Sequence, residues 1–137
     1  MLALEVTVNE RTISILSAHA TNPTDSDANS SQEAELQMIA TWSQEVRASG
    51  NAVLVVGDMN VTPWSPRYKR MLDDGSLVES MDGYGLQNTW PTGAPALVRL
   101  PKDNAAHSVG IDLWSRSTFS VEGSDHSALR FKVVVRP

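Results

Sequence analysis

The tetrapeptide Gly57-Asp58-Met59-Asn60 places a carboxylate and an amide directly after the apolar segment Ala52–Val56. The carboxylate of Asp58 can hold a water molecule or a hard cation, and the amide of Asn60 can ligate a cation or donate to a phosphoryl oxygen. Gly57 lets the backbone turn and approach a ligand closely. An Asx-type turn that ends a strand favours the same residues, so this tetrapeptide alone fits a site and a turn equally well.

The tetrapeptide Gly123-Ser124-Asp125-His126 places an acid and an imidazole just before the segment Ala128–Val135. In an extended strand the side chains of Asp125 and His126 point to opposite faces, but in a loop or bulge both can reach one pocket. Histidine carries protons near neutral pH, and a carboxylate partner fixes its tautomer. For an isolated Asp-His pair, a polar surface turn is the better interpretation.

His19 and Asp103 extend this pattern, because each lies at the end of a strand-like segment. Polar groups at the strand ends of one sheet share a rim, where functional residues concentrate. We therefore predict that His19 and Asp103 lie beside Asp58 and His126. Taken singly, His19 fits a surface residue and Asp103 fits a cap in a polar loop.

The hydrophobic pattern predicts the elements that must position these motifs. Alternating apolar residues predict a hairpin of two strands, Leu4–Val8 and Thr12–Ala18. An apolar stripe predicts a helix over Gln32–Ala48, and a capping box of Ser30 and Glu33 fits its start.

The rest of the chain alternates short regular segments with a long irregular one. Residues 76–101 are rich in Gly and Pro, and the sequence pattern places no helix or strand there. The other predicted elements are a buried strand over Ala52–Val56, a short helix from Ser65-Pro66 through Leu72 ended by Gly75, a strand within Asp103–Leu113 interrupted near Gly110, and a terminal strand over Ala128–Val135.

The composition sets limits on the class of protein. The chain has 137 residues, 41% hydrophobic and 20% charged, which fits one soluble globular domain. The absence of cysteine excludes disulfides, thiolate zinc sites and a cysteine nucleophile. A formal charge of −5 argues against a broad basic surface for nucleic acid, although a bound cation can still attract a phosphate. No apolar run is long enough to span a membrane and no signal segment follows Met1, so the sequence assigns no compartment.

The order of these motifs resembles the endonuclease/exonuclease/phosphatase superfamily, which has the fold of DNase I. In that superfamily a strand ends in His, followed by a Pro-containing loop and a helix, as at His19 and Pro23. A buried strand then leads into a Gly-Asp-Met-Asn motif such as residues 57–60, often followed by a Thr-Pro turn such as Thr62-Pro63. A Gly-Ser-Asp-His motif precedes the last strand, as at residues 123–126. The similarity runs from about residue 4 to the C-terminus.

The resemblance implies an α+β fold, an α/β sandwich with a mixed or antiparallel sheet and flanking helices. The complete family fold is a four-layer αββα sandwich, whose first half supplies an Asn and a metal-binding Glu. Glu5 and Asn9 do not match those positions, so residues 1–137 resemble the C-terminal half and form a single partial domain.

The resemblance also implies catalytic roles. His126 would lie closest to the attacking water or the scissile phosphate, and Asp58 would align or deprotonate that water. Asn60 would bind a non-bridging phosphoryl oxygen, and His19 would stabilise the charge that develops there. Asp103 keeps an acidic position of the family pattern, although Asn104 replaces the His that often follows it.

Magnesium or manganese is the cofactor that the resemblance implies, with Asp125, Asp58 and Asn60 as its candidate ligands. An oxygen-rich ligand set without thiols suits these ions. Trp64 is a candidate for stacking on a base or sugar of the substrate, although packing within a loop explains it better.

These expectations leave two functions open. The chain is predicted to be a divalent-metal-dependent phosphoester hydrolase, nuclease-like or acting on a phosphorylated small molecule or lipid. The alternative is a catalytically incomplete remnant that binds a phosphorylated ligand or a partner protein. A half-sandwich leaves one sheet face uncovered, so self-association or pairing with an N-terminal half is also expected.

Overall fold

The computed structural model describes residues 1–136. Its elements are β1 (Leu2–Val8), β2 (Arg11–His19), α1 (Ser26–Ala48), β3 (Ala52–Asp58), α2 (Pro66–Gly75), β4 (Val78–Glu79), the 3-10 helix η1 (Ala96–Val98), β5 (Asp103–His107), β6 (Ile111–Ser120) and β7 (Ser127–Val135).

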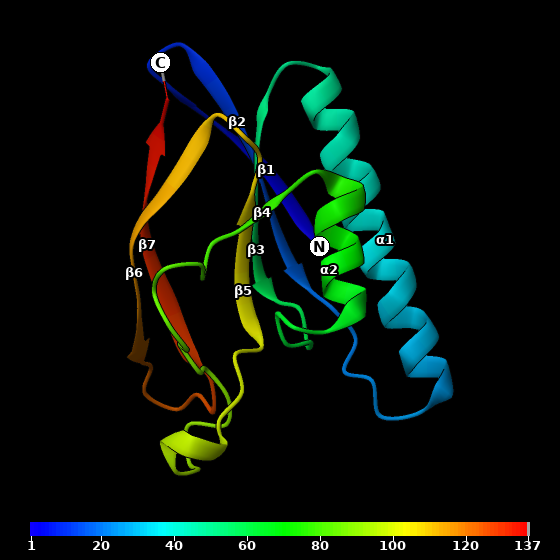
Figure 1. The fold of residues 1–137 in the computed structure, drawn as a ribbon, viewed down its shortest axis with the longest axis vertical. Helices are drawn as coiled ribbons and strands as arrows, with labels where there is room; N and C mark the ends of the chain where they lie inside the picture. The colour runs from blue at the N-terminus through cyan, green and yellow to red at the C-terminus, as the bar shows by residue number, and fades with distance from the viewer. Residues whose placement is uncertain (137) are drawn as a thin grey trace.

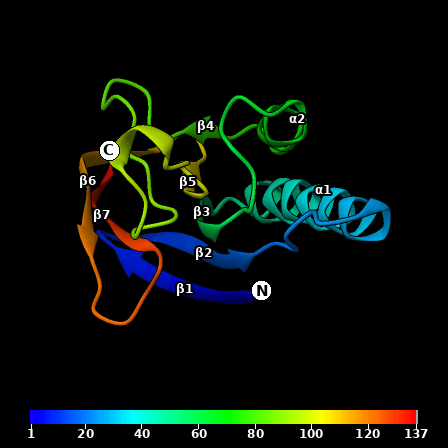
Figure 2. The ribbon, with the colours of Figure 1, turned by 90° about the horizontal axis from the view of Figure 1, so that it is seen from below.

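These elements form three layers: helices, a five-stranded sheet and a two-stranded sheet (Figures 1 and 2). The strand order of the larger sheet is β1-β2-β3-β5-β4, and β6 pairs with β7 in the smaller one. Strands β2 and β3 are parallel, whereas the other neighbouring pairs are antiparallel. The fold is therefore α+β with a mixed sheet, as the sequence predicted.

Two apolar clusters hold the layers together. On the helical side of the large sheet, Leu36, Ile39, Val53, Val55 and Met71 are almost fully buried between the sheet and both helices. Burial of each such side chain contributes about 1.5–3 kcal/mol. The second cluster fills the space between the sheets and consists of Ile13, Leu54, Ala105, Ile111 and Leu113. The alternation of residues along β3 supplies both clusters, as expected for a strand covered on both faces.

Helix α1 begins six residues earlier than predicted, at Ser26 instead of residue 32. Asp25 is its N-cap, and the Asp25 carboxylate accepts a hydrogen bond of 2.8 Å from the backbone N–H of Ala28. A carboxylate at this position also interacts favourably with the helix dipole. The capping box that we assigned to Ser30 is therefore wrong, since Ser30 lies inside the helix and donates to the carbonyl of Ser26.

The other predicted elements are present, with shifted ends. The hairpin of β1 and β2 is confirmed, and α2 continues through Gly75 to a left-handed cap at Ser76. The predicted strand in the region 103–113 is two strands, with Gly110 between them, and the second extends to Ser120. The region 76–101 contains only β4 and η1. Neither α-helix of the described chain has an apolar stretch of membrane-spanning length.

One face of β1 is apolar and open to solvent. Its side chains pair in register with the face of β2 that contributes to the inter-sheet cluster. The exposed residues, which we call the β1 face, are Leu2 at 66%, Leu4 at 44%, Val6 at 41% and Val8 at 39% exposure. Apolar residues that alternate along an edge strand normally pack against another layer.

Candidate active site

Three neighbouring strands place His19, Asp58 and Asp103 in a row at one end of the large sheet. His19 is the last residue of β2 and pairs in register with Asp58, the last residue of β3. Because β2 and β3 are parallel, both strands end at this edge of the sheet. Strand β5 is antiparallel to β3, so its first residue, Asp103, pairs with Asp58 from the other side. The sheet register therefore creates the rim that the sequence predicted.

His126 completes this row from the loop that precedes β7. Its Nδ1 lies 2.8 Å from Oδ2 of Asp103, and its Nε2 lies 3.9 Å from Oδ2 of Asp58. An ionised carboxylate only accepts hydrogen bonds, so Nδ1 carries the proton and donates to Asp103. This bond fixes the tautomer and turns Nε2 toward Asp58. The His126 side chain is 27% exposed, so the imidazole is partly accessible from solvent.

We call His19, Asp58, Asn60, Asp103 and His126 the cluster. The carboxylate of Asp58 lies at its centre. Burial raises the pKa of Asp58, and the negative charge of Asp103 adds to this rise. The backbone N–H of Asn60, which donates to Oδ1 of Asp58 at 2.8 Å, opposes it. Positive charge on His126 and His19 opposes it as well. Asp58 is thus a stronger proton acceptor than an exposed aspartate.

His19 approaches the same carboxylate from the solvent side. Its Nε2 lies 3.8 Å from Oδ2 of Asp58, but the His19 side chain is 79% exposed, against 14% for Asp58. His19 is therefore the most accessible imidazole of the cluster and is free to contact an approaching ligand.

Asn60 is held by its backbone and by both ends of its side chain. Its φ of 48° lies in the left-handed region, which asparagine tolerates better than most residues. The side-chain amide donates to the carbonyl of Ala20 at 2.8 Å, and its Oδ1 accepts a bond of 3.2 Å from Nζ of Lys102. Since Ala20 offers only an acceptor and Lys102 only donors, the orientation of the amide is unambiguous.

Gly57 is required where β3 passes β2. Its φ of 138° is one that side chains rarely adopt, and a Cβ at this position would overlap the carbonyl oxygen of Ala18. The glycine of the motif therefore serves close packing of two strands just before the reactive residues.

Asp125 lies beside the cluster, but its carboxylate points elsewhere. Its Oδ2 accepts a hydrogen bond of 3.0 Å from the indole N–H of Trp90. The Trp90 ring lies 6.2 Å from the His126 ring, and Nζ of Lys102 lies 4.0 Å from the centre of the indole. Sequence reasoning missed Lys102 and this use of Trp90. The adjacency of Lys102 to Asp103 was the available signal.

The sequence profile of the Endonuclease/Exonuclease/phosphatase family matches residues 3–126. The protein belongs to this family. The matched segment contains all five residues of the cluster, namely His19, Asp58, Asn60, Asp103 and His126. A search of curated proteins found no match.

Several solved structures share the fold. An endonuclease/exonuclease/phosphatase protein from Bacteroides vulgatus superposes with a TM-score of 0.73 at 14% identity, over 93% of this chain and 51% of that one. A 3' phosphatase from Neisseria, bound to a product DNA hairpin, gives a TM-score of 0.74 at 16% identity, over 95% of this chain and 63% of that one. A mannosyl-6-phosphatase from Bacteroides thetaiotaomicron gives 0.60 at 15% identity, over 90% of this chain and 51% of that one. The chain thus spans roughly half to two thirds of these relatives.

The cluster of this family member suits a divalent cation. Asp58, Asp103 and His126 each offer one ligand atom, and these atoms lie within 4.8 Å of one another. The two carboxylate oxygens are donors of the kind that magnesium and manganese prefer, and an imidazole nitrogen is a donor for several transition metals.

Trp64 lies apart from the hydrogen-bonded cluster, on the turn between Asn60 and helix α2. Its side chain is 51% exposed. It is thus available to a ligand that extends beyond the cluster, but nothing in its own surroundings marks it as a binding residue.

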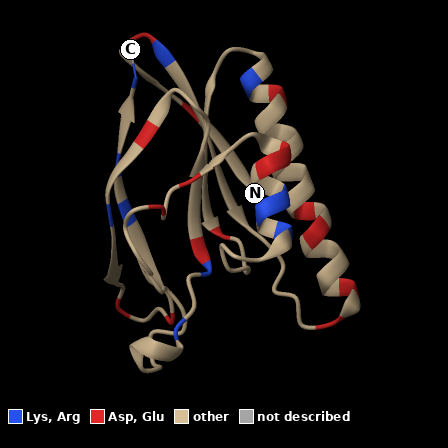
Figure 3. Ribbon diagram, viewed as in Figure 1, with Lys and Arg blue, Asp and Glu red and all other residues tan. Residues whose placement is uncertain are grey.

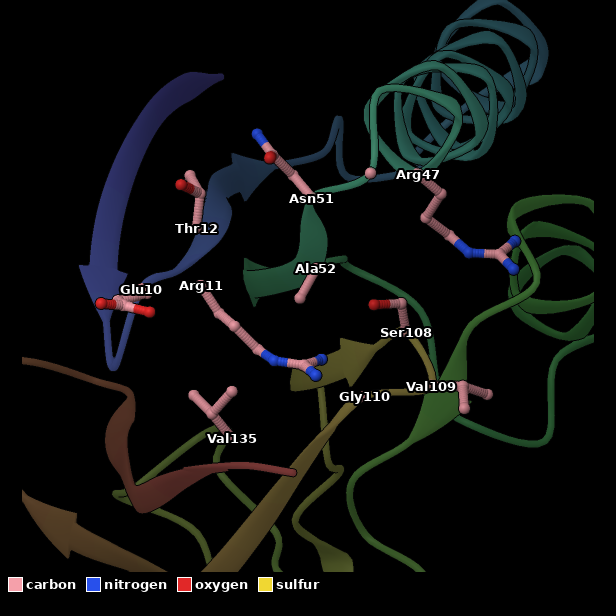
Figure 4. A pocket seen from close by; sticks show the side chains of 11 residues that line it. Glu10, Arg11, Thr12, Arg47, Asn51, Ala52, Ser108, Val109, Gly110 and Val135 are labelled. Carbon is pink, nitrogen blue, oxygen red and sulfur yellow. The ribbon is translucent and has the colours of Figure 1, made fainter. Parts of the chain in front are cut away.

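A hollow of about 450 Å³ lies at the opposite end of the five-stranded sheet (Figure 4). Its lining includes Arg11 at the start of β2, Arg47 in the last turn of α1 and Ser108 after β5. None of the cluster residues lines it. The cluster and this hollow are therefore separate places on the molecule.

Proposed function

We propose that this chain is the water-activating and phosphate-binding part of a divalent-metal-dependent phosphoester hydrolase. The observation that carries the proposal is the row Asp103–His126–Asp58, in which one carboxylate orients the imidazole toward the other. The family match supports the same reaction class, because family members are metal-dependent phosphoesterases.

In this proposal a water molecule binds between Nε2 of His126 and Oδ2 of Asp58. The two atoms are 3.9 Å apart, so one water oxygen can lie about 2.8 Å from both. Asp58 accepts the proton of this water as it attacks phosphorus, and its raised pKa favours this transfer. His126, held by Asp103, aligns the water, and the exposed His19 stabilises the charge that develops on the phosphoryl oxygens.

A bound magnesium or manganese ion would supply Lewis-acid polarisation of the phosphoryl group and neutralise its charge. Asp58, Asn60 and Asp125 are the ligands that we propose from the sequence, and Asp103 and His126, whose possible ligand atoms lie near that of Asp58, are further candidates. For this purpose Asp125 must exchange its bond to Trp90, and Oδ1 of Asn60 must exchange its bond to Lys102.

The test is hydrolysis of bis-p-nitrophenyl phosphate with magnesium or manganese. We expect p-nitrophenolate release that stops with EDTA and falls at least about 100-fold in His126→Ala, since His126 aligns the water. Activity that persists in both cases would contradict the proposal.

The alternative, a remnant that binds a phosphorylated ligand without hydrolysing it, is favoured by one observation. The chain spans only 51% of the Bacteroides vulgatus relative. Saturable binding of inorganic phosphate without metal-dependent hydrolysis would support this alternative. Activity that appears only in a longer polypeptide would support the hydrolase.

The substrate class is a phosphoester of nucleic acid or of a phosphorylated small molecule or lipid. The two similar structures named for their activities are a DNA-bound 3' phosphatase and a mannosyl-6-phosphatase, so the fold accommodates both kinds of substrate. We propose that Trp64 stacks on the base or sugar next to the scissile group.

We also propose that the β1 face is covered by another polypeptide segment, a second copy of this chain or an N-terminal half of the sandwich. Four exposed apolar residues on one strand face, listed above, support this proposal. Light scattering of the chain should give a dimer or larger species, and Leu4→Lys with Val6→Lys should shift it toward monomer. A clean monomer of the unaltered chain would contradict self-association.

A further inference from the structure

Lys102 places an ammonium group inside the candidate site. The residue lies at the entry to β5, immediately before Asp103, where Figure 3 shows basic and acidic residues side by side. Its Nζ donates to Oδ1 of Asn60 at 3.2 Å and lies 4.0 Å from the centre of the Trp90 ring. The residue is half-buried, so its charge is partly removed from bulk water.

The partners of this ammonium are neutral groups. Among residues 1–136, no carboxylate oxygen lies within 4.0 Å of Nζ, although Asp58 and Asp103 belong to the same site. An ammonium has three N–H donors. One N–H of Lys102 donates to the side-chain amide oxygen of Asn60, and the face of the Trp90 indole contacts another side of the ammonium. At least one N–H can therefore donate to a further acceptor.

Both neutral partners are themselves fixed. The amide of Asn60 is anchored to the carbonyl of Ala20, which leaves its oxygen facing Lys102. The indole N–H of Trp90 is anchored to Asp125, which fixes the plane of the ring under the ammonium. Simple packing of a lysine stem on a tryptophan would need neither anchor.

We propose that Lys102 binds a non-bridging phosphoryl oxygen of the substrate, and that Asn60 and Trp90 position it for this contact. The proposal deepens the proposed function and rests on it for the identity of the substrate as a phosphoester. It assigns to Lys102 a contact that the sequence assigned to Asn60, whose amide is already engaged. A preorganised cation with spare donors is well suited to an anionic, tetrahedral ligand.

The test is a titration of the whole chain with inorganic phosphate in a buffer that contains EDTA. Binding is monitored by NMR through the chemical shifts of the backbone amides of Asn60 and Asp103 and of the indole N–H of Trp90. Lys102→Met should weaken binding at least about tenfold, whereas Lys102→Arg, which keeps the charge, should stay within about threefold. Lys69→Met is the matched control, because Lys69 is an exposed lysine of α2 and should leave binding unchanged.

A double-mutant cycle separates positioning from direct contact. Asn60→Ala should weaken phosphate binding in the unaltered chain and have little further effect in Lys102→Met, because Asn60 acts through Lys102. Unchanged affinity in Lys102→Met would overturn the proposal. Lack of binding by the unaltered chain up to about 100 mM phosphate, a range in which even a weak site is detectable, would overturn it too.

Failure of the proposed function gives a different result. If neither this chain nor a longer polypeptide hydrolyses bis-p-nitrophenyl phosphate but phosphate binding still depends on Lys102, the hydrolase proposal fails and the Lys102 proposal stands. If the ester is hydrolysed, Lys102→Met should raise KM more than it lowers kcat, since the contact exists before the transition state. Hydrolysis with an unchanged KM in Lys102→Met would overturn the Lys102 proposal alone.

Discussion

The two ends of the five-stranded sheet differ in what their strands present. At one end, β2, β3 and β5 bring His19, Asp58 and Asp103 into register, and atoms of the cluster approach within 4 Å. At the other end, the hollow of about 450 Å³ is lined by Arg11 and Arg47, for which no ion pair is found among residues 1–136. Strand register, and not the presence of a hollow, therefore brings the candidate site residues together.

The physical reason lies in the strand directions. A parallel pair such as β2 and β3 delivers two carboxyl-terminal strand ends to the same edge, and loops that follow them have room for polar residues. Hydrogen bonds between neighbouring strands then fix the spacing of His19, Asp58 and Asp103. At the other end, Arg11 begins β2 whereas Arg47 lies in the last turn of helix α1, so no strand ladder sets the separation of the two arginines.

Gly57→Ala should have the largest effect, because it disturbs the contact between β2 and β3 that sets the register of the strands. The added Cβ would overlap the Ala18 carbonyl and the φ of 138° would be strained, so we expect a loss of at least about 3 kcal/mol in unfolding free energy. Urea denaturation measures this loss. Gly93→Ala is the control, since a Cβ there has open space, and its change should stay within about 0.5 kcal/mol. Equal stability of the two variants would show that strand contact does not define this end.

Asp103→Asn should damage the chemistry without unfolding the chain. An amide binds Nδ1–H of His126 more weakly than a carboxylate and can also present its N–H to Nδ1, so the tautomer that turns Nε2 toward Asp58 is no longer fixed. We expect kcat for bis-p-nitrophenyl phosphate to fall about 10²–10⁴-fold. The exposed Asp73 on α2 provides a matched Asp→Asn control that should retain full activity. A fall of less than about threefold in Asp103→Asn would remove Asp103 from the catalytic cluster.

Strand-end positions could be predicted from the sequence, and side-chain directions in loops could not. His19 and Asp58 follow apolar runs whose alternation locates the strand ends, so their shared rim was foreseeable. The direction of Asp125 toward Trp90 depends on how two loops, far apart in sequence, pack on each other. The same packing determines the position of Lys102 over the indole.

The start of α1 shows a second limit of the sequence pattern. Ser30 and Glu33 match a capping box, but Asp25 offers an earlier cap with a charged acceptor, and residues 26–31 have no strong helix breaker. Local signals of similar strength compete, and tertiary contacts decide between them. One such contact is Gln32, which is buried and donates to the carbonyl of Asn60 at 2.9 Å.

Asp58→Asn should stabilise the chain at neutral pH while it removes the proposed base. Burial raises the folded-state pKa of Asp58 above its unfolded value, so the ionised carboxylate destabilises the fold. Below the unfolded pKa, near 3.9, the two chains should be similarly stable, and the advantage of the variant should grow as pH rises through the folded pKa. Asparagine keeps the oxygen that accepts from the backbone of Asn60.

Urea midpoints measured in EDTA between pH 4 and pH 7 provide the measurement for Asp58→Asn, since a bound cation would alter the balance. If the stability advantage of Asp58→Asn shrinks as pH rises, the ionised carboxylate stabilises the fold. Its interactions with neighbouring positive charges would then outweigh the cost of its burial. The same result would weaken the case for Asp58 as a base, because its carboxylate would then be well compensated in the ground state.

Arg11→Ala combined with Arg47→Ala should have the smallest effect and tests the other end of the sheet. Strand β2 has nine residues, so its ends are separated by about 26 Å, between two and three times the screening length of salt at 0.1 M. The guanidinium groups therefore cannot steer a phosphoester held at Asp58 through direct electrostatics. We expect KM and kcat for bis-p-nitrophenyl phosphate to change by less than about twofold, and unfolding free energy by about 0.5 kcal/mol or less. A fivefold or larger rise in KM would mean that the substrate extends along the sheet to the hollow. The two ends of the sheet would then be two parts of one binding surface, with different roles.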